Sequence, residues 1–227
     1  MNTTTLLCAL AIVSGSAGCA LTSRSEPLRV RYYTLDSTPA HRLPGASRPI
    51  ELRLGRIEAS GHLGEEIAFR NGQHELEFYD DLRWSEKPQE YLRRALTRAL
   101  FQERGLTRAY SGMAPTLDVE LVEFEEWRKP QPEVRLQAIV TLHDERRSQL
   151  EETITVERPI KGASATAEHS AEATAAALSA AMSEAVAGLA DRVIAKLSAP
   201  SSATASSPAM PTPAAQAEAA AGSHAQP

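Results

Sequence analysis

The first 18 residues of this 227-residue chain carry no charged side chain, and this limits which part of it can fold into a domain. An apolar run over residues 6–13 is followed by small residues over 14–18, and Cys19 comes next. An apolar stretch of this length before small residues is typical of a secretory signal. It is too short to cross a bilayer as a mature helix. We therefore expect residues 1–18 to be removed on export and to take no part in the fold.

Cys19 is the one cysteine expected in the mature chain, because Cys8 lies within the signal. The triplet Ser16-Ala17-Gly18 before it resembles a bacterial lipobox, in which small residues fit the peptidase and the following thiol receives the lipid. The alternative is an ordinary secretory signal that leaves a free thiol, since residues 1–5 contain no Lys or Arg. Lipidation of Cys19 predicts attachment to a membrane surface without crossing it. It also leaves no thiol for catalysis or metal binding.

The residues that follow the cysteine predict the membrane to which the protein is attached and a tether. The far end of the chain predicts a tail. In Gram-negative bacteria an Asp directly after the lipidated cysteine tends to retain a lipoprotein in the inner membrane. Ala20 therefore favours the outer membrane, facing the periplasm. Residues 19–27 predict a lipidated tether. Residues 198–227 are rich in Ala, Ser and Pro with Glu218 as the single charge, which predicts a disordered tail.

Composition and motifs exclude several classes of function. The net charge of -5 leaves no electrostatic footprint for nucleic acid. The chain has no Walker loop, no G-x-G-x-x-G and no G-x-S-x-G, and its six histidines are scattered singly. We therefore expect no catalytic residue, no metal site and no cofactor beyond the covalent lipid. The acidic stretches at residues 75–81 and 123–126 predict solvated strand faces that discourage edge pairing.

Residues 28–197 number about 170, which suits one domain. Helical spacing of apolar residues predicts helices over 88–105 and 166–197. The dipeptide Asn71-Gly72 predicts a hairpin turn. Alternating patterns predict strands at residues 28–36, 49–54, 66–70, 74–79, 116–123, 134–142 and 151–158. Such strands imply a sheet with one wet face. The fold class predicted is α+β: a two-layer domain whose mainly antiparallel or mixed sheet is covered by two amphipathic helices.

The two tryptophans are candidates for a partner surface. Trp84 lies just before the first helix, where packing of the helix start against the sheet is the favoured interpretation and a partner contact the other. Trp127 lies at a strand end or hairpin tip, so we expect it to be the more exposed of the two.

Three groups of residues, in this order and spacing, resemble the ABC-type transport auxiliary lipoproteins of Gram-negative bacteria, including the paraquat-inducible C type. The first is Tyr32-Tyr33-Thr34-Leu35-Asp36, shortly after Cys19. The second is the span 50–100, in which Leu63 sits in a small-residue turn and Trp84-Ser85-Glu86-Lys87-Pro88 leads into a Leu-rich helix. The third is the Ala-rich helix near the end. The resemblance covers about residues 19–197. It departs from the family at Ala59-Ser60-Gly61-His62-Leu63, where members often have a Val-Pro and an aromatic residue before the Leu.

The resemblance implies an adaptor without catalysis. The candidate residues for contact with a partner are Trp127, Leu63 and Trp84. Members of the family work with a periplasmic MCE-domain protein and, through it, an ABC permease and ATPase. They are thought to help move phospholipid or another hydrophobic compound between the inner and outer membranes, with a homo-oligomeric ring as one arrangement. A chaperone-like lipoprotein that assists outer-membrane assembly is the alternative. Carriage of lipid by the domain itself would require an apolar pocket, which a sequence does not reveal.

Overall fold

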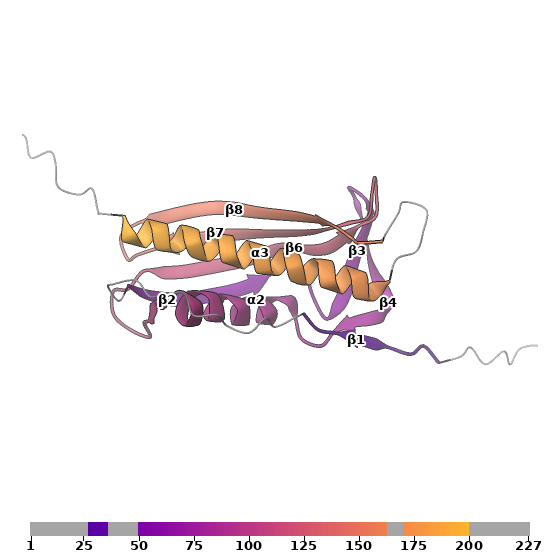
Figure 1. Cartoon of the computed structure of the whole chain (residues 1–227), viewed down its shortest axis with the longest axis horizontal. Helices are drawn as coiled ribbons and strands as arrows, with labels where there is room; N and C mark the ends of the chain where they lie inside the picture. Colours follow the sequence, from indigo (N-terminus) through magenta and orange to yellow (C-terminus); the bar gives the residue numbers. More distant parts are fainter. Residues whose placement is uncertain (1–26, 36–49, 163–169, 200–227) are drawn as a thin grey trace, which may run out of the picture.

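The computed structural model describes residues 27–35, 50–162 and 170–199, so the predicted signal, Cys19 and residues 200–227 of the predicted tail lie outside the described residues. The described chain forms a mixed sheet of eight strands with two long helices on one of its faces (Figure 1). The strands are β1 (Arg31–Tyr33), β2 (Glu51–Ala59), β3 (Glu66–Gly72), β4 (Glu75–Trp84), β5 (Thr107–Arg108), β6 (Thr116–Trp127), β7 (Glu133–His143) and β8 (Ser148–Pro159). The helices are α2 (Pro88–Thr97), which continues as the π-helical segment η2 (Arg98–Glu103), and α3 (Ala171–Ser198). The predicted α+β fold class is confirmed.

Strands β6, β7 and β8 form an antiparallel meander that makes up most of the sheet. Alternate residues of β7 are buried on the helix side, because side chains point to opposite faces along a strand: Val134, Leu136, Ala138, Val140 and Leu142. On β8 the buried pair is Ile154 and Val156. The alternation read from the sequence therefore gave the correct inward face for these strands.

The second edge of β6 is shared between two strands, which no sequence pattern indicated. Its first half pairs in parallel with β2, and its end pairs in parallel with β3 through Phe69 and Glu126. A bulge in β2 makes room at Gly55, where a Cβ atom would lie 2.2 Å from Oδ1 of Asp118. That carboxylate instead accepts a hydrogen bond of 2.6 Å from the backbone amide of Arg56. Close approach, and not a positive φ, favours glycine here, because a Cβ would have to displace the side chains of Asp118 and Thr116.

The β3–β4 hairpin is confirmed, but its turn lies two residues beyond the predicted one. Gly72 still pairs with Glu75, so the turn consists of Gln73 and His74. The side chain of Asn71 donates a hydrogen bond to the carboxylate of Glu77 across the hairpin. This contact holds Asn71 in the strand, so the Asn-Gly pair does not form the turn that local propensity favours.

Both helices pack on the same face of the sheet, α3 over β6 to β8 and α2 over β2 (Figure 1). Helix α3 begins at Ser170, whose Oγ accepts a hydrogen bond of 3.1 Å from the amide of Ala173. The residues predicted to start this helix, 166–169, lie outside the described residues. By length and composition α3 is apolar enough to cross a membrane, but 61% of its most apolar window is buried inside the domain. Its apolar side chains belong to the core, where Leu178 and Val193 are fully buried.

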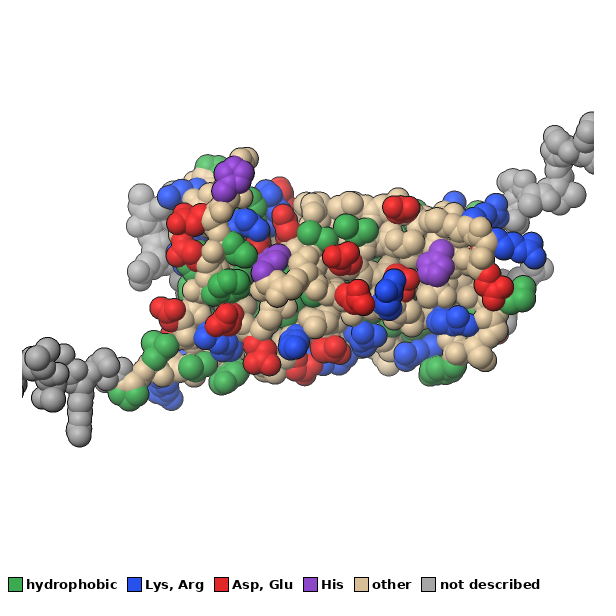
Figure 2. All heavy atoms as spheres, turned by 180° about the vertical axis from the view of Figure 1, so that it is seen from behind, with side chains coloured by type: hydrophobic (Ala, Val, Ile, Leu, Met, Phe, Trp, Pro, Cys, Tyr) green, Lys and Arg blue, Asp and Glu red, His purple; other side chains and the backbone are tan. Residues whose placement is uncertain are grey.

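Among the described residues no helix covers the opposite face of the sheet, and Figure 2 shows that face from outside. Charged side chains of both signs are scattered over it, and hydrophobic ones gather mainly at the end where the chain enters. This matches the wet face that the alternating strands predicted.

Candidate functional site

Trp84 and Leu63, two of the three residues predicted to contact a partner, are buried in this structure. Trp84 is 1% exposed and packs between Phe124 and Tyr91, with ring centroids 5.5 and 6.2 Å away. Leu63 is 5% exposed and belongs to the same core. Neither side chain offers a surface to a partner here. The position of Trp84 matches the packing interpretation, because it joins the start of α2 to β6.

Trp127 is half-buried at the end of β6, between two guanidinium groups. The guanidinium carbon of Arg135 lies 4.2 Å from the centre of its ring, and that of Arg70 lies 5.5 Å away. Arg135 also pairs with Glu157 on β8 at 2.8 Å. A cation over an indole face is favourable, so these two arginines stabilise the position of Trp127 within a charged surface. It is the more exposed tryptophan, as predicted, while its contact with a partner stays a prediction.

The acidic run at residues 123–126 is not the solvated face that we expected, because Glu125 and Glu126 are both 0% exposed. Glu125 points to the open face of the sheet and pairs with Arg70. Its second oxygen lies 3.6 Å from Nε2 of His62, in the loop that carries Leu63. A buried carboxylate needs such partners, because leaving water costs several kcal/mol. The ion pair with Arg70 therefore ties β3 to the end of β6.

Glu126, on β6, points to the helix face of the sheet and connects β6 to β4 and α3. Its carboxylate accepts hydrogen bonds from the hydroxyls of Tyr79 at 2.6 Å and Thr174 at 3.2 Å. It also pairs with Arg128 at 3.1 Å. The guanidinium of Arg128 in turn lies 3.6 Å above the ring of Phe69. Because Thr174 lies in the first turn of α3, this buried carboxylate positions the start of that helix on β4 and β6.

Alkaline pH should weaken the fold through Tyr79. Burial, and then its hydrogen bond to Glu126, raise the pKa of Tyr79 to about 12 from the usual 10.0. Below pH 10 the hydroxyl is protonated in both states, so its contribution to stability is fully present. Between about pH 10 and 12 the unfolded chain loses this proton while the folded chain keeps it, so stability falls. We expect the urea midpoint to fall less steeply over this range in Tyr79→Phe than in the parent chain. Equal slopes would contradict this role.

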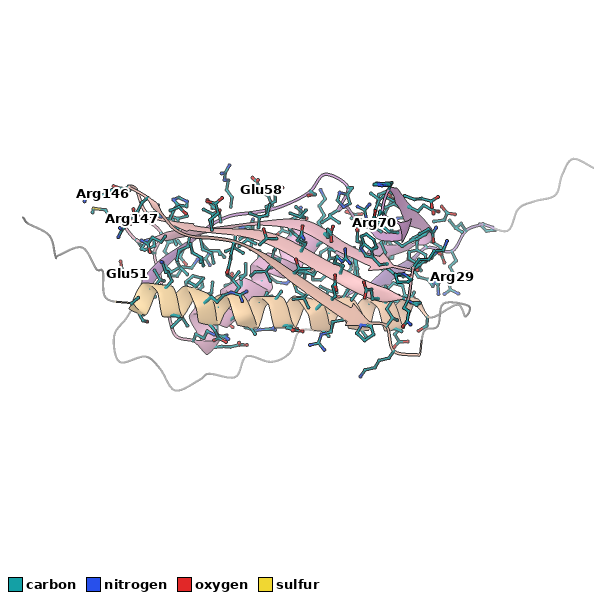
Figure 3. All side chains as sticks on the ribbon, turned by 90° about the horizontal axis from the view of Figure 1, so that it is seen from above. Arg29, Glu51, Glu58, Arg70, Arg146 and Arg147 are labelled. Atoms are coloured by element: carbon teal, nitrogen blue, oxygen red, sulfur yellow. The ribbon has the colours of Figure 1, made fainter. Side chains whose placement is uncertain are left out.

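The two ends of the domain carry exposed hydrophobic side chains. At the end where the chain enters from residue 27, Leu28, Val30 and Tyr32 are exposed. At the opposite end Tyr110 is 81% and Met113 73% exposed. These two residues lie in the loop before β6, whose first residue pairs with the last of β7. They therefore share this end with the β7–β8 turn, which Figure 3 marks by Arg146 and Arg147, far from Arg29.

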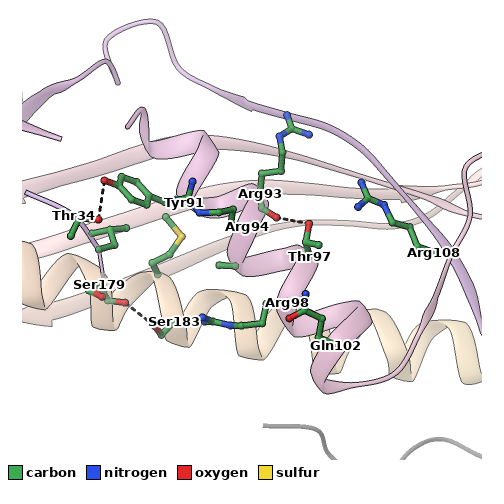
Figure 4. A pocket seen from close by; sticks show the side chains of 13 residues that line it. Thr34, Tyr91, Arg93, Arg94, Thr97, Arg98, Gln102, Arg108, Ser179 and Ser183 are labelled. Atoms are coloured by element: carbon green, nitrogen blue, oxygen red, sulfur yellow. Dashed lines mark hydrogen bonds between the residues drawn. The ribbon is translucent and has the colours of Figure 1, made fainter. Parts of the chain in front are cut away.

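A cleft of about 460 Å³ lies between α2, η2, α3 and the end of β1 (Figure 4). Four of its lining residues are arginines, and the lining includes neither Asp nor Glu among the described residues. Its apolar part is formed by Leu35, Tyr91, Ala95 and Met182. Sequence reasoning missed this cleft, because α2 and α3 are distant in the chain and their arginines resemble an ordinary solvated helix face. Across residues 27–35, 50–162 and 170–199, no group of three or more His, Cys, Asp or Glu is placed to hold a metal ion.

The family model for ABC-type transport auxiliary lipoprotein components matches residues 33–194. The chain belongs to this family. The match spans more than half of the 227 residues and runs from the last residue of β1 through the cleft to most of α3. Membership confirms the resemblance seen in the sequence, and it makes the chain a lipoprotein component of a transport system. We found no curated protein that matches this auxiliary lipoprotein.

Solved structures support the fold of this family member. A Xanthomonas campestris protein of the DUF330 family aligns with a TM-score of 0.61 at 20% identity, covering 74% of this chain and 96% of that one. A second, uncharacterized protein aligns with a TM-score of 0.54 at 15% identity, covering 73% and 99%. At these identities the likeness concerns the fold alone.

Proposed function

We propose that this chain is the lipid-anchored auxiliary subunit of an MCE-type ABC system that moves lipid or another hydrophobic compound between the inner and outer membranes. In this proposal Cys19 carries the lipid at the outer membrane, the domain faces the periplasm, and it docks the periplasmic MCE-domain protein. That protein connects it to the ABC permease and ATPase. Membership of the transport auxiliary family supports the role. The domain acts by binding and performs no catalysis.

The observation that carries the docking role is the pair of exposed hydrophobic residues at the end away from the tether. Tyr110 and Met113 are far more exposed than large apolar residues normally are, and the guanidinium of Arg108 lies 5.2 Å from the Tyr110 ring. Exposed aromatic residues beside an arginine are typical of the centre of an interface. An anchor that enters near β1 leaves this end free to reach a partner across the periplasm (Figure 3). Trp127, on the open sheet face, is a second candidate contact.

A pull-down of the mature lipoprotein from solubilised membranes tests the assignment. We expect an MCE-domain protein as the dominant partner. A β-barrel protein as the dominant partner would favour the chaperone-like alternative, and recovery of no MCE or permease subunit would contradict the proposal.

Paired substitutions locate the docking surface. Tyr110→Ser with Met113→Ser should weaken capture of the MCE-domain protein by at least about tenfold, because interface hot spots cost about 2 kcal/mol or more when truncated. The matched control is Tyr32→Ser, which removes a similarly exposed tyrosine, 67%, at the tether end. Binding should be measured by titration on immobilised lipoprotein. Equal capture by the paired variant and the control would place the docking surface elsewhere.

A further inference from the structure

The end of the domain that the tether enters carries exposed apolar side chains, which we call the tether-end patch: Leu28, Val30 and Tyr32. They are 63%, 40% and 67% exposed. The three residues occupy alternate positions where the chain leads into β1, and such positions share one face of a strand. Figure 1 shows this stretch running outward from the end of the domain that holds β4. Clustered apolar exposure marks a site of contact with a protein or a membrane.

Two ion pairs lie beside the tether-end patch, so the charges next to it largely cancel. Arg31 pairs with Asp81 of β4 at 2.8 Å. Arg83, which pairs in register with Tyr32, lies 3.0 Å from Glu66. An anionic phospholipid surface repels carboxylates that have no cation beside them, and the whole chain has a net charge of -5. Because these two carboxylates are compensated, the patch can approach such a surface.

The length of the tether decides which surface the patch meets. Residues 20–27 separate Cys19 from Leu28, and a fully extended chain of this length reaches only about 30 Å. The patch therefore stays close to the membrane that the lipid enters. A short tether gives an effective concentration of millimolar order, so even a weak contact is populated. The far end of the domain is less favoured, because α3, with its 28 residues, extends about 42 Å along the long axis (Figure 1).

We propose that Leu28, Val30 and Tyr32 contact the phospholipid surface of the membrane that holds the lipid on Cys19. This inference builds on the lipid anchor of the proposed function. A tyrosine ring suits the interface between acyl chains and headgroups, because its body is apolar and its hydroxyl is polar. Leu28 and Val30 add apolar area that leaves water on contact. The contact turns the opposite end of the domain away from the bilayer and toward the periplasm (Figure 3).

A fluorophore on a single introduced thiol tests the contact in the mature lipoprotein on vesicles. Arg29→Cys and Arg146→Cys each supply one reactive thiol, because Cys8 leaves with the signal and Cys19 is acylated. Figure 3 shows these two positions at opposite ends of the domain. The vesicles contain phosphatidylethanolamine and phosphatidylglycerol, with or without a phospholipid that carries a nitroxide near its headgroup. We expect the nitroxide to quench the label at residue 29 at least about twofold, since tethering keeps half of the domains or more in contact. The label at residue 146 should keep its intensity.

Substitutions in the chain labelled at residue 29 then assign the contact to the patch. Leu28→Ser with Val30→Ser should lower the ratio of bound to free domains at least about tenfold, because two apolar side chains lose their burial. The matched control is Ile139→Ser on β7, since Ile139 is 39% exposed and Val30 40%. Quenching should be the same in this control as in the labelled parent. Unchanged quenching in the paired variant, or equal losses in the control, would overturn the proposal.

The same samples separate failure of this contact from failure of the proposed function. Uptake of the fluorophore by the mature chain without an introduced thiol would show that Cys19 is free, and would contradict the lipid anchor together with the contact. Full acylation without quenching at residue 29 would contradict the contact alone. A blue shift of that label that grows with protein density, without quenching by the nitroxide, would replace the bilayer by a second copy of the chain. Capture of the MCE-domain protein is measured without a bilayer and does not depend on this result.

Discussion

Replacing Trp84 with alanine should lower the free energy of unfolding by about 3–5 kcal/mol, the usual cost of removing a large buried aromatic side chain. Trp84 is 1% exposed, and its ring meets that of Tyr91 edge to face and that of Phe124 at a tilt. The substitution therefore leaves a cavity where α2, β4 and β6 meet, and it also removes two aromatic contacts. Urea unfolding followed by circular dichroism measures the loss.

Trp127→Ala is the matched control, because it removes the same side chain from a half-buried position on the sheet surface. We expect it to cost well under half as much as Trp84→Ala. If Trp84→Ala costs less than about 1 kcal/mol, the ring does not support the core as described. A large loss of partner binding in folded Trp127→Ala, with stability nearly intact, would favour Trp127 as a contact residue.

Glu126→Ala should be destabilising by roughly 3 kcal/mol, since it leaves two hydroxyls and a guanidinium without their shared acceptor. Tyr79 and Thr174 both donate to this carboxylate, and Arg128 pairs with it. Glu126→Gln should cost less, because its amide oxygen still accepts from the hydroxyls. Chemical denaturation gives the free energies, and hydrogen exchange should show the first turn of α3 opening more often in Glu126→Ala.

Glu184→Ala is the control for loss of an acidic residue from an ion pair. Its partner is Arg158, and both side chains are about half exposed, so we expect a change of less than about 1 kcal/mol. Similar losses for Glu184→Ala and Glu126→Ala would show that burial of Glu126 adds nothing to the fold.

The class of fold was predictable because its signals are local. The alternation in β7 and the apolar stripe of α3 depend only on neighbours in the chain, and the structure has both elements where the periodicity placed them. The predicted position of the turn in the β3–β4 hairpin was wrong. A cross-strand hydrogen bond from Asn71 to Glu77 outweighs the local preference of Asn-Gly for the turn. The short strand β5 has too few residues to give any pattern.

The residues of the candidate sites were harder to predict, because their environment comes from distant parts of the chain. Glu125 and Glu126 look like a solvated charge run, yet their partners Arg70 and Tyr79 arrive from the β3–β4 hairpin, about 50 residues earlier. The cleft likewise forms only when α2 and α3 lie side by side on the sheet.

By itself, the sequence predicted an export signal and a lipid site at Cys19, and it determined the pattern of strands and helices and enough motif order to indicate the family. Each of these signals is contained in a short stretch of chain, so it does not depend on how distant segments pack. Tertiary structure decided that Trp84 is core and Tyr110 is surface, that two adjacent glutamates are buried on opposite faces of β6, and that four arginines line one cleft. Burial and electrostatic environment depend on which distant segments pack together, and β6 acquires that environment only when β2 and β3 share its edge.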